Sequence, residues 1–243
     1  MNQEREADNN GVRNCYVAFC DILGFSNSIL TEFDRTLDIY KGFGDLISGF
    51  PLKEVQVTMY SDAILVTSDS LPRVLQAVQG LWFYAVSHGF MIRGAIAKGR
   101  YWEKRQDNHF FVASDALVRA VKLEKAVGIP AVVIADDIEI EDRYWLARFT
   151  EGVFVTPLLH FRDRNIVNPF GIYWYRSAAD HVRELLARHP EHRDKYLWYL
   201  SLHEAVGKGW ELIPSDVLAR FLRDGILRDA SKGQNIEPQD SAG

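Results

Sequence analysis

The sequence predicts an α+β protein with a ferredoxin-like core and a C-terminal helical elaboration. β-prone runs alternate with stretches of helical spacing in the order β-α-β-β-α-β-α-β over residues 14–140. That order is the split βαβ arrangement, which gives a largely antiparallel sheet with helices on one face. Helical patterns then run through residues 177–228, after two possible short strands.

The first strand is expected at "CYVAFC", residues 15–20, which is short, β-prone and mostly apolar. From Ser26 onward an apolar stripe at helical spacing predicts one amphipathic helix; the stripe consists of Ile29, Leu30, Phe33, Leu37 and Tyr40. The β-prone runs "EVQVTMY" and "AILVTS" are separated only by Ser61 and Asp62, and this spacing predicts a hairpin.

A second helix is expected over "LPRVLQAVQGLWFYAVSH", with Pro72 in its first turn. Its apolar stripe consists of Leu71, Val74, Leu75, Val78, Leu81, Trp82 and Ala85. "MIRGAIAKG" predicts a strand, and the charged "EKRQDNHF" after it predicts a loop or a hairpin tip. "SDALVRAVKLEKAV" predicts a helix capped by Ser114 or Asp115, and "IPAVVIAD" predicts the next strand.

Composition restricts the class of protein. The chain has 243 residues, 47% of them hydrophobic and 25% charged, which is ordinary for a soluble globular protein. A net charge of -5 argues against a general binder of nucleic acid or membrane surfaces. Cys15 and Cys20 point to opposite faces of one strand, so they cannot easily pair, and reduced thiols are expected. Because neither a signal peptide nor a membrane-spanning run is found, the expected location is the cytoplasm.

The chain is expected to divide into four segments. Residues 1–13 and 229–243 are polar and predict disordered ends. Residues 14–150 form the core, and residues 151–228 add strands and helices that pack on it. The aromatic-rich "KYLWYLSLHEAV" fits this packing role, since aromatic side chains usually mark a core.

Two acidic residues stand out by their position. Asp21 closes the first strand and Asp62 lies in the hairpin turn, so in a ferredoxin-like sheet both carboxylates meet at one end. Two carboxylates a few ångströms apart repel each other and favour a hard divalent cation, usually Mg²⁺ or Mn²⁺. A bridging pair can hold two ions about 3.5–4 Å apart, the geometry of phosphoryl-transfer sites. The alternative is that both aspartates are merely turn formers, and spacing alone gives it about equal weight.

The turn after Asp21 supplies a second element of such a site. "LGFSNS" leads from strand to helix, so the backbone N–H groups of Gly24, Phe25 and Ser26 lie at a helix N-terminus. N–H groups in that position can cradle a triphosphate.

The motif "FCDILGFS" resembles the "F-x-D-I-x-G-F-[ST]" signature of class III nucleotidyl cyclases. "YSDAILV" falls where that family has the hairpin with its second metal aspartate. "IRGAIAKG" and "ALVRAVKLEKA" are similar to the family's fourth strand and to its "V-N-x-A-x-R-L-E" helix. The resemblance covers roughly residues 14–140, and the first motif is its most specific part.

The resemblance implies a ferredoxin-like catalytic core, a nucleoside triphosphate substrate and an obligatory homodimer with sites at its interface. It also implies two divalent cations held by Asp21, Asp62 and the backbone carbonyl of Ile22. Gly24, Phe25 and Ser26 would surround the phosphates. The products would be a 3′,5′-cyclic nucleotide and pyrophosphate.

This chain departs from the family where purine cyclases read the base. Aligned by hand, those positions hold Thr58 and roughly Phe111, neither of which carries the charge expected for adenine or guanine. Tyr60 and Arg93 lie nearby, and Arg93 could donate to a pyrimidine O2 or O4, although a surface cation is an equally good interpretation.

The helix "ALVRAVKLEKA" departs from the family too. The transition-state Asn and Arg of the family align with Val118 and Lys122, and Arg119 would substitute if the helix is rotated. Lys122 can neutralise charge but cannot form a bidentate fork. Which residues replace the missing pair is left open by the sequence.

The combination resembles the bacterial pyrimidine cyclases of the Pycsar anti-phage systems. That resemblance implies synthesis of cyclic UMP or cyclic CMP, a preference for Mn²⁺, and a separate effector that binds the product. UTP is favoured over CTP, because no acidic residue is placed to accept from the cytosine amino group. The alternatives are a purine cyclase and a catalytically inactive cyclase-like protein that only binds nucleotide. The "HPEH" run, His189 to His192, is more typical of a surface helix cap than of a metal site.

Overall fold

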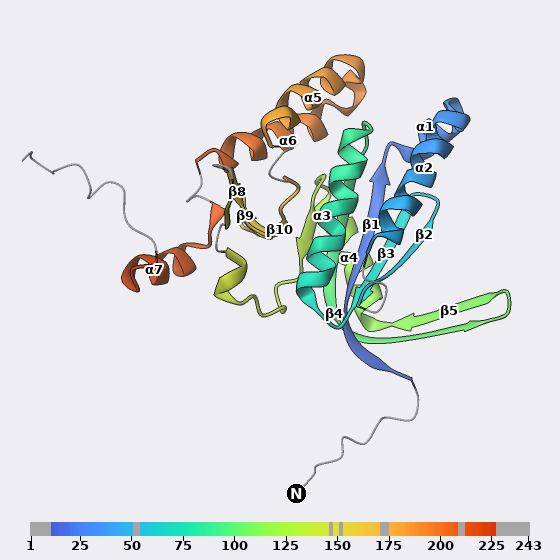
Figure 1. Ribbon diagram of the computed structural model, residues 1–243, viewed down its shortest axis with the longest axis horizontal. Coiled ribbons are helices and arrows are strands. Elements are labelled where there is room, and N and C mark those ends of the chain that lie inside the picture. Colours follow the sequence, from blue (N-terminus) through green and yellow to red (C-terminus); the bar gives the residue numbers. More distant parts are fainter. Residues whose placement is uncertain are drawn as a thin grey trace, which may run out of the picture.

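An eight-stranded sheet forms the centre of the protein in the computed structural model, which describes residues 11–50, 54–145, 148–150, 153–170, 175–208 and 212–226 (Figure 1). The strand order is β2-β3-β1-β4-β6-β10-β9, and β5 pairs with β4. These strands are β1 (Arg13–Leu23), β2 (Gln56–Tyr60), β3 (Ala63–Ser68), β4 (Met91–Gln106), β5 (His109–Ser114), β6 (Val132–Ile134), β9 (Leu158–Phe161) and β10 (Arg164–Val167). β7 (Arg148–Thr150) and β8 (Val153–Val155) form a separate two-stranded ladder.

The α-helices are α1 (Phe25–Thr31), α2 (Phe33–Ser48), α3 (Leu71–Ser87), α4 (Asp115–Val127), α5 (Tyr175–Arg188), α6 (Arg193–Val206) and α7 (Ser215–Arg223). Two short 3₁₀ turns, η1 (Asp142–Trp145) and η2 (Pro190–His192), complete the described elements. The α+β fold predicted from the sequence is confirmed. Among the described helices, none is long and apolar enough to cross a membrane.

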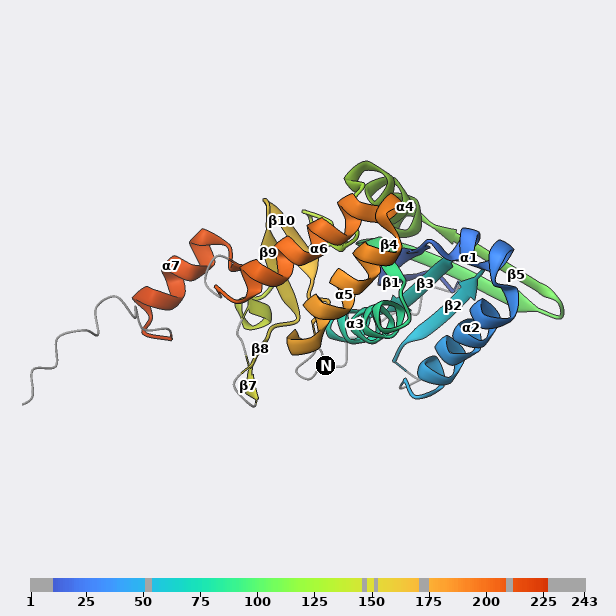
Figure 2. The same ribbon diagram turned by 90° about the horizontal axis from the view of Figure 1, so that it is seen from above.

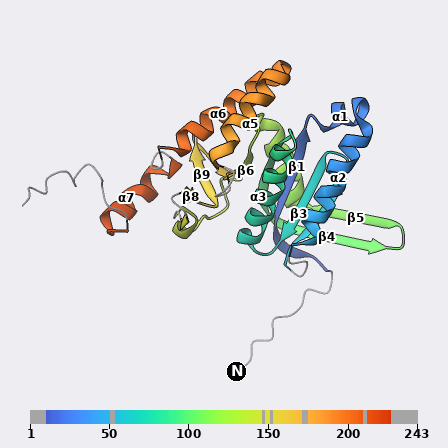
Figure 3. The same ribbon diagram turned by 45° about the horizontal axis from the view of Figure 1, so that its top comes forward.

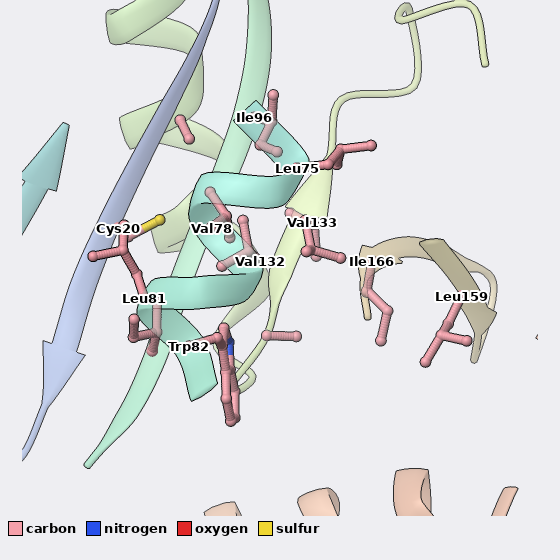
Figure 4. Close-up of a cluster of buried hydrophobic side chains, with 14 of the residues drawn as sticks. Cys20, Leu75, Val78, Leu81, Trp82, Ile96, Val132, Val133, Leu159 and Ile166 are labelled. Atoms are coloured by element: carbon pink, nitrogen blue, oxygen red, sulfur yellow. The ribbon is translucent and has the colours of Figure 1, made fainter. Parts of the chain in front are cut away.

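The helix α3 packs on one face of the sheet, and its whole predicted apolar stripe is buried. Because strand side chains alternate, Cys20 of β1 and Ile96 of β4 point to this face (Figure 4). Leu81 and Trp82 of α3 belong to the same apolar cluster (Figure 4). Cys15 belongs to a second cluster, and both cysteines are free, as their spacing predicted.

The helix α4 covers the opposite face, so the prediction of helices on one face only is wrong (Figure 2). Ala116 of α4 packs in the cluster that contains Cys15 and Val17 of β1. Gly99 of β4 permits this approach, since a Cβ there would lie 2.2 Å from Oδ1 of Asp115. Ser114 is the N-cap of α4 and accepts a hydrogen bond from the Leu117 N–H at 3.0 Å, as predicted.

The single helix expected after Ser26 is two helices that meet at Glu32. Thr36, Ile39 and Phe43 form the buried side of α2. The side chains of Leu30 and Phe33, two members of the predicted stripe, are instead 85% and 58% exposed. The break at Glu32 rotates the second helix relative to the first, so one continuous stripe could not describe both.

The segment "EKRQDNHF" forms the tip of a long hairpin, which is the second of the two predicted alternatives. β4 continues to Gln106 and returns as β5, which the sequence analysis did not predict as a strand. The hairpin extends away from the body of the protein (Figure 1). Phe110 and Phe111 on β5 are 39% and 52% exposed.

The C-terminal segment extends the same sheet through β10, which pairs with β6. Tyr199 of α6 stacks on Trp82 of α3 with 5.4 Å between ring centroids, which fastens the C-terminal helices to the core. Arg220 of α7 pairs with Asp142 of η1. The expected disordered ends fall outside the described residues, apart from residues 11–13, of which Arg13 begins β1.

Candidate active site

One row of paired residues crosses four strands at the end of the sheet. Tyr60 pairs with Ala63, Ala63 pairs with Asp21, and Asp21 pairs with Arg93. Directly paired residues project to the same face, so the side chains of Tyr60, Asp21 and Arg93 all lie on the face that α4 partly covers. The chain thus places three predicted site residues in one line.

Asp62 joins this row through the turn between β2 and β3. Ser61 adopts a left-handed conformation with φ 55°, which closes the tight turn. The Ile22 N–H donates to the Asp62 carbonyl oxygen at 2.9 Å, so the turn is fixed directly against the end of β1. The predicted meeting of Asp21, Ile22 and Asp62 at one end of the sheet is therefore present in the geometry.

The two aspartates repel each other. Burial raises the pKa of the Asp21 carboxyl and the negative charge of Asp62 raises it further, while Arg93 opposes both. A hard cation placed between the two carboxylates would relieve this repulsion. Within the described part of the chain, no group of three or more His, Cys, Asp or Glu side chains is placed to hold a metal ion. Mg²⁺ and Mn²⁺ fit such a two-carboxylate site when substrate phosphates complete the coordination.

Arg93 links Asp21 to the buried carboxylate of Glu124. Its Nη2 donates to Asp21 Oδ2 at 3.2 Å, and its Nε forms an ion pair with Glu124 of α4. The Glu124 side chain is only 3% exposed. Sequence reasoning missed Glu124, because its contact with β4 depends on α4 crossing that face of the sheet. Arg93 is therefore held by two carboxylates instead of being free to donate to a base.

The turn after Asp21 is also organised around the aspartates. Gly24 caps α1 with φ 89°, a left-handed conformation that a residue with a side chain adopts only with strain. The Ser26 hydroxyl donates to Asp62 Oδ2 at 2.7 Å, so this side chain orients a carboxylate. The Phe25 side chain is buried between Tyr40 and Phe90, which leaves only its backbone N–H for a phosphate.

The predicted base-reading residue Thr58 lies one row further along the same face. It pairs with Leu65, and Leu65 pairs with Phe19. Arg105 of the long hairpin donates to the Thr58 hydroxyl at 3.2 Å and lies over the ring of Phe110 at 4.2 Å. Sequence reasoning missed Arg105, because it lies in the charged segment "EKRQDNHF" that was predicted as a loop or a hairpin tip. Phe111 pairs with Lys104 and is half exposed.

The predicted transition-state residues are not brought to this row. Val118, Arg119 and Lys122 lie on the exposed side of α4, whereas Glu124 on the same helix faces the sheet. Arg119 forms an ion pair with Asp137 and donates to the Lys98 carbonyl oxygen.

A pocket of about 240 Å³ adjoins the turn after Asp21. One wall comes from α1 and the start of α2, and the other from η2 and the start of α6. The tip of the α5–α6 pair lies at the same end of the sheet as α1 and the end of β1 (Figure 3). Lys195 of α6 lines the pocket, and its charge acts on Asp21, where it lowers the pKa.

No protein-family model and no curated protein matches the sequence. Among solved structures, the fold is similar to that of the adenylyl cyclase CyaB from P. aeruginosa, with 15% identity and a TM-score of 0.40 over 66% of this chain and 96% of that one. It is similar to a bacterial light-regulated adenylyl cyclase, with 12% identity and a TM-score of 0.42 over 72% and 99% of the two chains. It is also similar to a class III adenylyl cyclase-like ATP-binding protein from Pseudomonas aeruginosa, with 10% identity and a TM-score of 0.43 over 70% and 40%. Likenesses at this level assign neither a substrate nor an activity to this chain.

Proposed function

We propose that the protein is a pyrimidine nucleotide cyclase, which converts UTP, or CTP, to the 3′,5′-cyclic nucleotide and pyrophosphate. The observation that carries the proposal is the row of Tyr60, Asp21 and Arg93, with Asp62 fastened beside Asp21 by the Ile22 N–H. Two carboxylates so close together favour a divalent cation, which supports a site for a metal-bound nucleotide.

The residues around the end of β1 divide the tasks in this proposal. Asp21 and Asp62, with the backbone carbonyl of Ile22, hold two divalent cations, Mn²⁺ or Mg²⁺. Ser26 orients the Asp62 carboxylate through its 2.7 Å hydrogen bond. The backbone of Gly24 to Ser26 borders the phosphates, because the left-handed Gly24 turns the chain there.

The reaction is an intramolecular displacement. The ribose 3′-hydroxyl loses its proton to solvent water and its oxygen forms a bond to the α-phosphorus, the bond from that phosphorus to the bridging oxygen breaks, and pyrophosphate leaves with the electron pair. When bound, the cations activate the 3′-hydroxyl and neutralise the leaving group. The chain contributes the positions of the carboxylates and the positive charge of Arg93 beside them.

The pyrimidine assignment rests on the neutral base-reading positions Thr58 and Phe111. Tyr60, whose side chain is 83% exposed, offers a flat ring on the same face. Because Arg93 is occupied by two carboxylates, Arg105 is the donor better placed to meet a base carbonyl beside Thr58. Uracil, with two carbonyl acceptors, suits this donor.

A homodimer completes the site in this proposal. Arg119 or Lys122 of the second copy would stabilise the α-phosphate, since both lie on the exposed side of α4. The exposed aromatic side chains Phe110 and Phe111 on the projecting hairpin offer an apolar surface to that copy.

The product would act as a second messenger in anti-phage defence, bound by a separate cyclic-nucleotide-binding effector, and the enzyme would work in the cytoplasm. No binding of nucleic acid or membrane is expected from a chain with a net charge of -5.

The test is to incubate the protein separately with ATP, GTP, CTP and UTP in the presence of Mn²⁺ and to identify products by mass spectrometry. Cyclic UMP or cyclic CMP is the expected product. A cyclic purine would replace the proposal with a purine cyclase. No cyclic product from any of the four nucleotides, together with measurable nucleotide binding, would favour an inactive cyclase-like binding protein.

A further inference from the structure

The pocket between α1 and the α5–α6 tip is rich in basic side chains. It is lined by Arg35, His88, Arg188, His189, His192 and Lys195. Two acidic residues, Glu32 and Glu191, line it as well. Arg35, Arg188 and Lys195 carry three positive charges against these two carboxylates, so the balance of charge favours an anionic ligand.

Three of these basic side chains already have acidic partners. Arg35 pairs with Glu32, Arg188 pairs with Glu184, and His189 pairs with Glu191. Lys195 is different, because it forms neither an ion pair nor a hydrogen bond with any residue in the described part of the chain. It is partly buried in the first turn of α6, and its ammonium group is available to a bound anion.

The pocket adjoins the candidate active site at the turn after Asp21. Gly24, which follows two residues after Ile22, is part of its wall, as are Asn27 and Ser28 of α1. At about 240 Å³ the pocket is smaller than the roughly 300–1,000 Å³ typical of sites that enclose a whole ligand. This volume suits one end of a nucleotide, and the charge identifies that end as the phosphate chain.

We propose that Lys195, supplied by the C-terminal helices, binds the terminal phosphates of the nucleotide and that the pocket between Gly24 and η2 is the phosphate subsite. This assignment rests on the proposed nucleotide function. The segment after residue 150 then takes part in substrate binding, because it supplies Lys195 to the site formed by Asp21 of the same chain.

The test measures binding of inorganic tripolyphosphate with Mn²⁺ by calorimetry, which needs neither a base nor turnover. Lys195→Ala is expected to weaken binding about 10-fold, in line with the loss of one charge-assisted hydrogen bond. Arg193→Ala is the matched control, because Arg193 lies on the same turn but does not line the pocket. Lys195→Arg should retain most of the affinity, since the positive charge remains.

Kinetics separate this inference from the proposed function. In an active enzyme, Lys195→Ala should raise KM for the nucleotide with little change in kcat. A cyclase whose Lys195→Ala variant binds tripolyphosphate as tightly as the wild type would overturn the phosphate subsite and leave the cyclase standing. An equal loss in Arg193→Ala would overturn it too. A selective loss in Lys195→Ala without any cyclic product would support the subsite while rejecting the cyclase.

Discussion

Arg93 donates from Nη2 to Asp21 Oδ2 at 3.2 Å while its Nε contacts Glu124, whose side chain is 3% exposed. One guanidinium thus pairs with both a candidate metal ligand and a buried carboxylate. Arg93→Met leaves Glu124 buried without its partner and should lower the free energy of unfolding by about 3 kcal/mol. The double variant Arg93→Met, Glu124→Leu should recover part of that loss, as measured by urea denaturation.

Arg100→Met is the control for this experiment. Arg100 pairs with Asp115 on the surface and its side chain is 80% exposed, so the loss should be below about 1 kcal/mol. A loss in Arg93→Met no larger than that in Arg100→Met would mean that the buried ion pair contributes nothing.

The carboxylate pair predicts the effect of Mn²⁺ on stability. A ligand present at 100 times its Kd stabilises the native state by about 2.7 kcal/mol. Asp21→Asn and Asp62→Asn should each abolish the Mn²⁺-induced rise in Tm and reduce cyclase activity more than about 100-fold. Asp45→Asn, on the exposed side of α2, should leave both unchanged. Retention of the Mn²⁺ effect in Asp21→Asn would remove the carboxylate pair as the metal site.

The raised pKa of Asp21 predicts how stability depends on pH without metal. Because the folded-state pKa lies above the ordinary value of 3.8, the ionised carboxyl destabilises the fold as pH rises through the folded pKa. Asp21→Asn should therefore have a higher Tm than the wild type at pH 7.5 in the presence of a chelator. The difference should vanish at and below about pH 4.

Asp142 is expected to have the opposite effect on the pH dependence of stability. Its hydrogen bonds from Arg220 lower its pKa, so its stabilisation is present above the ordinary value of 3.8 and is lost as pH falls through the folded pKa. Asp142→Asn should therefore lower Tm at pH 7.5. If both variants shift Tm in the same direction, the environment assigned to Asp21 is wrong.

Substitution of two glycines by alanine is expected to change stability in opposite directions. Gly24 has φ 89°, and a Cβ there would meet only Phe90 at 3.9 Å, so the cost of Gly24→Ala is one of backbone strain. We expect a loss of about 1 kcal/mol, together with weaker nucleotide binding because the turn changes. Gly44 lies within α2 with open space around it, and Gly44→Ala should stabilise by about 0.5–1 kcal/mol. Thermal unfolding of the two variants gives the comparison.

The proposed dimer predicts complementation between two inactive variants. Asp21→Asn and Lys122→Met proteins, each inactive alone, should regain about a quarter of wild-type activity when mixed in equal amounts. Half of the dimers are then mixed, and each mixed dimer has one intact site. No recovery despite subunit exchange would show that Lys122 serves the site of its own chain.

Phe111 offers an independent test of the same interface. Phe111→Asp should shift the sedimentation of the protein from dimer to monomer, because a carboxylate would be buried against the second copy. Leu222→Asp on α7, an equally drastic change at a residue that is 40% exposed, should not.

Features that depend on neighbouring residues in the sequence were predictable, whereas features that depend on contacts between distant segments were not. The stripe of α3 and the turn at Asp62 were predictable, because a regular period and a two-residue gap are local signals. The contacts of Arg93 with Glu124 and of Arg105 with Thr58 were not, since they depend on how a helix crosses the sheet and how a hairpin curls. The break at Glu32 left no signal in the pattern of apolar residues.

Asp21 and Lys195 differ in how their backbones can move. β1 is hydrogen-bonded to a neighbouring strand on each side, so the Asp21 backbone is released only when the middle of the sheet opens. Lys195 follows η2, in which no residue is buried, and such a segment opens by local fluctuation with little loss of packing. Hydrogen exchange should therefore be slow at the carboxylate strand and fast at the α5–α6 tip. When a phosphate chain binds, the carboxylates should therefore stay in place, whereas Lys195 can move inward with the phosphates.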